Sequence, residues 1–116
     1  MKVSFEGIGA YAATFYNSAS APAKAGQPVK MGESGTVAAC SAGDSFLGVA
    51  VTADGDFAGV QLQGFVTLPY TGTAPTPGLV TLGADGSGGV KTVSTGGRGC
   101  WVIQVDTAAS TVGFLL

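Results

Sequence analysis

The chain has 116 residues, with five basic and seven acidic side chains, no histidine and a mean hydropathy of +0.41. Its charges form no basic stripe for phosphates, and no apolar stretch approaches the roughly 20 residues that span a bilayer. These features argue against nucleic acid and membrane partners. They predict one domain with a thin core, which leaves apolar surface free for an interface.

A glycine pattern near the amino terminus resembles a dinucleotide-binding sequence. The strand-like residues 2–6 precede Gly-Ile-Gly-Ala-Tyr-Ala at 7–12. Such a pattern binds dinucleotides when a β-α-β unit surrounds it, but here the chain continues into Asn-Ser-Ala-Ser-Ala-Pro-Ala. We therefore expect no nucleotide cofactor, and predict that the glycines bend the chain between two extended pieces.

Aromatic and large apolar residues crowd the first sixteen positions. Tyr11–Tyr16 favours a strand or a loose arm, and the small, polar residues 17–28 favour a flexible connector. We predict an N-terminal arm and linker over residues 1–25 and a compact β domain over residues 26–116. The predicted interface residues of the arm are Phe5, Ile8, Tyr11, Phe15 and Tyr16. The alternative is that this arm is the first core strand.

Turn residues then mark a series of hairpins. Residues 28–32 and 36–41 flank a Glu-Ser-Gly turn, and a second hairpin within residues 46–70 turns at Asp-Gly. In the second hairpin, Val49 and Val51 are predicted on one face. Gly64 suggests a bulge or the close approach of another backbone, and Pro69 a strand end or an edge strand.

The carboxyl half continues the same pattern. Strands are predicted at 79–83, 90–93, 101–106 and 112–116, with turns or loops between them. Trp101, Ile103 and Val105 are predicted on one face, with Trp101 in the core. Strands that recur roughly every 8 to 12 residues predict an all-β fold. We expect a small β-barrel or barrel-like sandwich built from antiparallel hairpins, with an extended N-terminal arm.

The residues offer little for catalysis or for metals. The chain lacks histidine, its carboxylates are single, and its serines have no evident base partner. Residues 83–92 lack the glycine that precedes the lysine of a phosphate loop, and residues 54–56 lack the pattern of a calcium loop. Cys40 and Cys100 are expected to be small buried side chains, with a disulfide as the alternative. We expect a protein that is not an enzyme and has no metal or cofactor.

The order of these features resembles the small decoration, or cement, proteins of tailed bacteriophage capsids. The resemblance covers about residues 26–116 and includes Gly-Gln-Pro-Val, Ser-Ala-Gly-Asp, Val-Gln-Leu-Gln-Gly, Pro-Gly-Leu-Val and Val-Ile-Gln-Val-Asp. It implies a structural protein, usually a homotrimer, that is made in the bacterial cytoplasm. Such a protein binds the outside of the virion where major capsid subunits meet and clamps the subunits against internal DNA pressure.

Two other functions remain open at this stage. A carbohydrate or cell-surface binding module would use Trp101, Tyr70 and Tyr16 as stacking faces for sugar rings. A structural subunit of another assembly, such as a tail or a pilus, is the remaining possibility.

Overall fold

The computed structural model describes residues 10–116, and this part of the chain folds entirely into strands and loops without a helix. The predicted all-β class is therefore confirmed. Five strands in the first half close into a barrel, in the order β1-β3-β2-β4-β5. They are β1 (Tyr11–Asn17), β2 (Pro28–Met31), β3 (Thr36–Ala39), β4 (Gly48–Asp54) and β5 (Phe57–Gln63).

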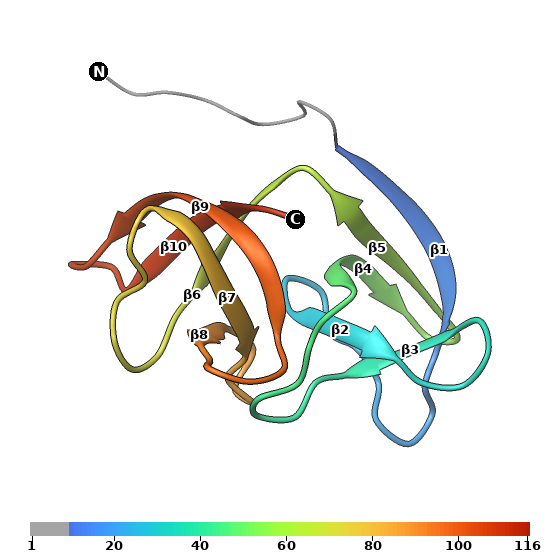
Figure 1. Cartoon of the computed structure of the whole chain (residues 1–116). Coiled ribbons are helices and arrows are strands. Elements are labelled where there is room, and N and C mark those ends of the chain that lie inside the picture. Colours follow the sequence, from blue (N-terminus) through green and yellow to red (C-terminus); the bar gives the residue numbers. More distant parts are fainter. Residues whose placement is uncertain (1–9) are drawn as a thin grey trace.

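The second half contributes a five-stranded sheet in the order β6-β10-β9-β7-β8. Its strands are β6 (Phe65–Pro69), β7 (Gly78–Ala84), β8 (Val90–Thr92), β9 (Arg98–Asp106) and β10 (Thr111–Leu115). An isolated parallel bridge joins Tyr70, just past β6, to Val90 in β8, so the two edges of this sheet approach each other. Figure 1 shows the two halves side by side, blue to green for the first and yellow to red for the second.

The predicted hairpins are present because their turn residues satisfy the backbone that they reverse. Gly55 has a φ of 60° in the two-residue connection from β4 to β5, a conformation that glycine adopts at little cost. Asp85 accepts hydrogen bonds from the N–H groups of Ser87 and Gly89, 2.7 and 3.0 Å away, and so fixes the turn from β7 to β8. The predicted turn at 83–92 is therefore a hairpin.

The predictions for Gly64 and Pro69 also hold. Gly64 has a φ of 106°, and a Cβ there would lie 2.8 Å from the Cα of Ala10, so another backbone does approach it closely. Pro69 ends β6, which lies at the edge of its sheet, where its missing N–H removes no ladder bond.

Two predicted faces are wrong, and each error occurs at a β-bulge. Val51 is an extra residue between the pairs of β4 with β5, so Val49 is buried while Val51 is 55% exposed. Ile103 is an extra residue between the pairs of β9 with β10. It separates Trp101 from Val105, and Trp101 is 56% exposed instead of in the core. A bulge inverts the alternation beyond it, which a strict period of two cannot anticipate.

The second half repeats the first. In the repeat, β1 to β5 correspond in order to β6 to β10. With the Tyr70–Val90 bridge counted as a pairing of β6 with β8, each strand of the second sheet has the same neighbours as its counterpart in the barrel. The register of the pairs agrees as well. In the first half Asn17 pairs with Val37 in parallel, and in the second half Tyr70 pairs with Val90 in the same way. The two bulges fall at the same place. The pairing of β7 with β9 departs from the repeat: it is longer than that of β2 with β4, and its register is shifted by two residues.

Each half has its own core, built at equivalent positions. The first core contains Val29, Val37, Ala50, Ala58 and Val60. Their counterparts in the second core are Leu82, Val90, Val102, Val112 and Phe114. Each counterpart is the same residue or a larger one, so the second core holds more apolar volume. The first core is correspondingly thin, and this half depends more on its neighbours for stability.

The loop at residues 40–47 joins the halves. Ala84, at the end of β7, accepts a hydrogen bond from the N–H of Gly43 (2.8 Å) and donates one to the carbonyl of Asp44 (2.9 Å). Phe46 of this loop is 2% exposed, belongs to the second core and lies edge-on to Phe114, with ring centroids 6.1 Å apart. Arg98 covers the Phe46 ring, with its guanidinium carbon 6.0 Å from the centroid.

The N-terminal segment enters this architecture from Tyr11 onward. β1 pairs along its length with β5 and, at its end, with β3, so it closes the barrel. The segment predicted as an arm and linker, 1–25, thus includes a barrel strand, and Phe15 packs against the first core. The Gly-x-Gly sequence at 7–9 lies outside the described residues.

Candidate interaction surfaces

The five predicted interface residues have three different placements. Tyr11 and Tyr16 project from β1 and are largely exposed. Phe15 points the other way and packs against the first core. Phe5 and Ile8 lie outside the part of the chain that the structure describes. The strand alternation therefore brings Tyr16, but not Phe15, to the surface.

Tyr16 is half of a stacked aromatic pair. Its ring lies against that of Phe57, with centroids 5.6 Å apart and planes 29° from parallel. The two side chains are 60% and 54% exposed, because residues paired across antiparallel strands project from the same face. A shallow cavity of about 450 Å³ adjoins them, lined also by Thr14, Phe15 and Gly35. Tyr16 and Phe57 are named here the aromatic surface.

Phe57 was not predicted as an interface residue. It follows Asp-Gly-Asp directly at the start of β5. Polar residues are usual beside a hairpin turn, so a large aromatic residue at this position is the sequence feature that could have indicated an exposed apolar side chain. Its contact with Tyr16 was not available from sequence, since it depends on the pairing of β1 with β5.

A second apolar surface crosses the sheet of the second half. Trp101 in β9 pairs with Leu79 in β7 on one side and with Leu115 in β10 on the other. Leu79 is 67% exposed and Leu115 is partly buried. Paired residues share a face, so these three side chains form one row, named here the Trp101 row. Leu79 and Trp101 are large, rigidly mounted apolar groups of the kind that anchor protein interfaces.

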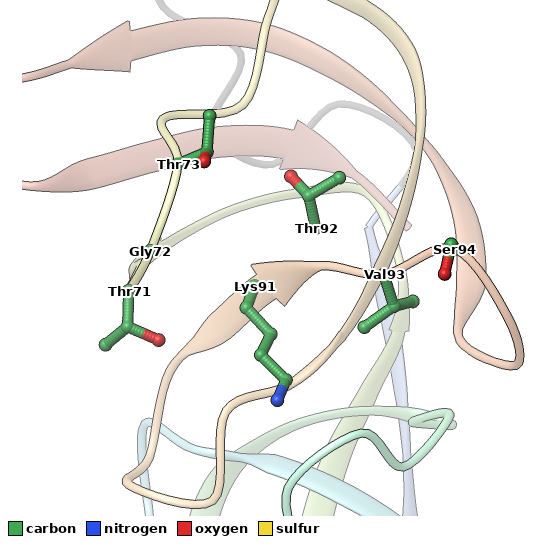
Figure 2. A pocket seen from close by; sticks show the side chains of 7 residues that line it. All are labelled: Thr71, Gly72, Thr73, Lys91, Thr92, Val93 and Ser94. Carbon is green, nitrogen blue, oxygen red and sulfur yellow. The ribbon is translucent and has the colours of Figure 1, made fainter.

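A cavity of about 510 Å³ lies between the loop after β6 and the end of β8. Figure 2 shows it with its lining residues Thr71, Gly72, Thr73, Lys91, Thr92, Val93 and Ser94. None of these seven is aromatic. The Lys91 side chain extends away from the hydroxyl of Thr92, as neighbours on a strand do, so the polar groups do not converge on one point.

The residues considered for sugar stacking do not form one platform. Trp101 is exposed, but Tyr70 is buried in the second core. Tyr16 belongs to the other half of the molecule, in β1. A sugar would therefore meet Trp101 without either of the other two rings.

The two cysteines are free thiols packed against the second core, Cys100 inside it and Cys40 at its margin. Burial raises the pKa of each thiol to about 11, and nearby Asp44 adds to the effect at Cys40. Both thiols are therefore protonated at neutral pH and are weak nucleophiles.

Asp44 forms an ion pair with Lys30. Its carboxylate lies 2.7 Å from the ammonium group of Lys30 and accepts a hydrogen bond from the N–H of Ser41 at 2.8 Å. The bond from Lys30 chiefly, and that from Ser41, hold the pKa of the Asp44 carboxyl below its usual value. Among residues 10–116, no three His, Cys, Asp or Glu side chains gather as metal ligands would.

Comparison with known proteins gives no assignment: the chain matches no family model and no curated sequence. In the described part of the chain, no helix is long and apolar enough to cross a membrane.

Proposed function

We propose that this chain is a non-enzymatic structural protein that decorates and stabilises the capsid of a tailed phage or prophage. It binds the outer surface between major capsid subunits and associates with itself, as a homotrimer. It reaches the capsid exterior after synthesis in the bacterial cytoplasm. The order of sequence features that resembles capsid decoration proteins supports this proposal.

The exposed apolar surface carries the proposal. Among residues 10–116, large hydrophobic side chains are exposed on both halves of a small domain with few charges. They are Tyr11, Tyr16, Met31, Val51, Phe57, Leu79 and Trp101. A monomer in solution gains nothing from exposing such groups, whereas an assembly that covers them gains roughly 1.5–3 kcal/mol for each large apolar side chain fully buried.

The aromatic surface is our proposed contact with the major capsid protein. The stacked rings are held on two paired strands, so little conformational entropy is lost when they are covered. The adjoining shallow cavity accepts an apolar side chain of the shell.

Binding to capsids that lack the protein tests this function directly. Purified heads are mixed with the protein, sedimented and assayed for bound chain. Wild type is expected to saturate at a fixed number of copies per head. The double substitution Tyr16→Ser, Phe57→Ser is expected to weaken binding, and Val51→Thr, which alters an exposed valine away from the aromatic surface, serves as the matched control. Failure of the wild type to bind contradicts capsid decoration.

Exposure of Trp101 favours one other function, a carbohydrate or cell-surface binding module. An exposed indole is the usual stacking face for a sugar ring. Consistent hits on a glycan array that Trp101→Ala abolishes in a folded protein would support this alternative over capsid decoration.

A further inference from the structure

The two equivalent halves differ in which of their surfaces are covered. Val49 and Trp101 occupy equivalent positions in the repeat. Val49 pairs with β5 two residues before the bulge of β4, and Trp101 pairs with β10 two residues before the bulge of β9. Both point out of their own half. Val49 is buried in the core of the second half. Trp101 is 56% exposed, and Leu79 beside it is 67% exposed.

The opposite side of the repeat shows the reverse arrangement. Met31 and Ala84 are equivalent, because Met31 pairs with Val37 as Ala84 pairs with Val90. Ala84 is buried beneath the loop at 40–47, to which it makes two backbone hydrogen bonds. Met31 is 45% exposed.

The contact between the halves thus joins two different surfaces. The first half supplies the side that bears Val49, Phe46 and Gln27, and the second half receives it on its β7–β8 hairpin. Close approaches mark this fit: a Cβ on Gly86 would lie 3.1 Å from the backbone of Ala42, and one on Gly88 would lie 2.7 Å from the Gln27 amide. At each of these two pairs of equivalent positions, one residue is covered within the chain and its counterpart is left exposed.

We propose that a second copy of this chain covers the Trp101 row with its β2–β3 hairpin, residues 28–39, so that copies join head to tail. The contact between copies then repeats the kind of contact already made between the two halves. Both leftover surfaces are apolar at the equivalent points, Trp101 with Leu79 on one and Met31 on the other. Methionine is flexible enough to fit against a rigid indole.

A contact of this kind joins unlike surfaces, so further copies add in the same sense until a ring closes. Closure after three copies gives the homotrimer of the proposed function, on which this inference rests. Gly35, in the turn of this hairpin, also lines the cavity beside Tyr16 and Phe57. We therefore place the contact on the Met31 side of the hairpin, which leaves the rings of the aromatic surface available for the shell.

Complementation between two variants tests the contact. Trp101→Glu blocks one surface and Met31→Glu the other, and each is expected to weaken self-association about 30-fold or more, as loss of an interface hot spot does. Mixed in equal amounts, the two variants still share one intact pair of surfaces and are expected to form a 1:1 dimer that grows no further. Sedimentation velocity measures each species, and formation of the dimer shows that both variants fold. Val51→Glu, which charges an exposed valine outside both surfaces, is expected to keep the wild-type mass.

Three results overturn the inference: a monomeric wild type, a wild-type mass for either blocked variant, or a mixture that stays monomeric although both variants retain the β-sheet circular dichroism of the wild type. Head binding is scored separately. If wild type binds heads but Trp101→Glu keeps the wild-type mass, the head-to-tail contact fails and capsid decoration stands. If complementation succeeds and no chain binds heads, the contact stands and capsid decoration fails.

Discussion

Phe46→Ala tests whether the loop at 40–47 joins the two halves into one cooperative unit. Phe46 is 2% exposed, and it contacts Phe114 at the centre of the second core and the guanidinium of Arg98. Truncating a buried phenylalanine costs about 3–5 kcal/mol, from lost burial and the cavity left behind. A chain of this length has a total stability of roughly 6–17 kcal/mol, so the loss is a large share of it.

Urea denaturation followed by the fluorescence of the single tryptophan measures this loss, and a thermal scan checks it. At about 4 °C per kcal/mol, the midpoint is expected to fall by about 12–20 °C. Val51→Thr, an exposed and β-branched control, is expected to change stability by less than about 0.5 kcal/mol. A loss below about 1 kcal/mol for Phe46→Ala would refute the view that this side chain holds the halves together.

Three further predictions concern single positions. Gly48→Ala places a Cβ 2.2 Å from a backbone carbonyl of β5, so it is expected to lower the free energy of unfolding by about 1–3 kcal/mol, as measured by denaturation. The control Gly99→Ala, whose Cβ meets nothing within 4 Å, is expected to leave stability unchanged. Equal effects of the two substitutions would contradict the packing at Gly48. Cys40 and Cys100 have pKa values of about 11, so both thiols are expected to react slowly with iodoacetamide at pH 8 and quickly once the chain unfolds. Mass spectrometry measures the labelling. Rapid labelling of the folded protein would be inconsistent with burial of the thiols. The ion pair of Asp44 contributes stability above the ordinary carboxyl pKa of about 3.9, and this contribution is lost as pH falls through the lower pKa of the folded state. Asp44→Asn is therefore expected to lower stability at neutral pH and to flatten its decline in acid, and an unchanged pH profile of denaturation would exclude this role.

The hairpins could be predicted because local residues determine them. Gly55 and Asp85 reverse the chain through their own conformation and hydrogen bonds, so neighbouring sequence suffices. The faces of β4 and β9 could not be predicted in full. Val51 and Ile103 are ordinary strand residues, and nothing in their chemistry marks them as bulged; the extra residue is evident only from the partner strand.

The repeat and the candidate surfaces depend on tertiary structure to a greater degree. Val60 and Phe114 fill equivalent core positions but differ greatly in size, so the two halves share a pattern of burial more than a sequence. Tyr16 was predicted at an interface and is exposed. Its partner Phe57 could not be predicted, because the two rings meet only when β1 pairs with β5. The exposure of Trp101 could not be predicted either, because strict alternation along β9 puts Trp101 on the same face as Ile103 and Val105, and the bulge at Ile103 breaks that alternation.

The central claim is that this protein covers its exposed apolar surface by binding copies of itself and a larger shell. Sedimentation equilibrium from micromolar to millimolar concentration tests the first part most directly. The account predicts a closed oligomer of fixed size, expected to be a trimer, whose formation shifts the emission of Trp101 to shorter wavelength. A monomer throughout that range, with an emission that concentration does not change, would contradict it.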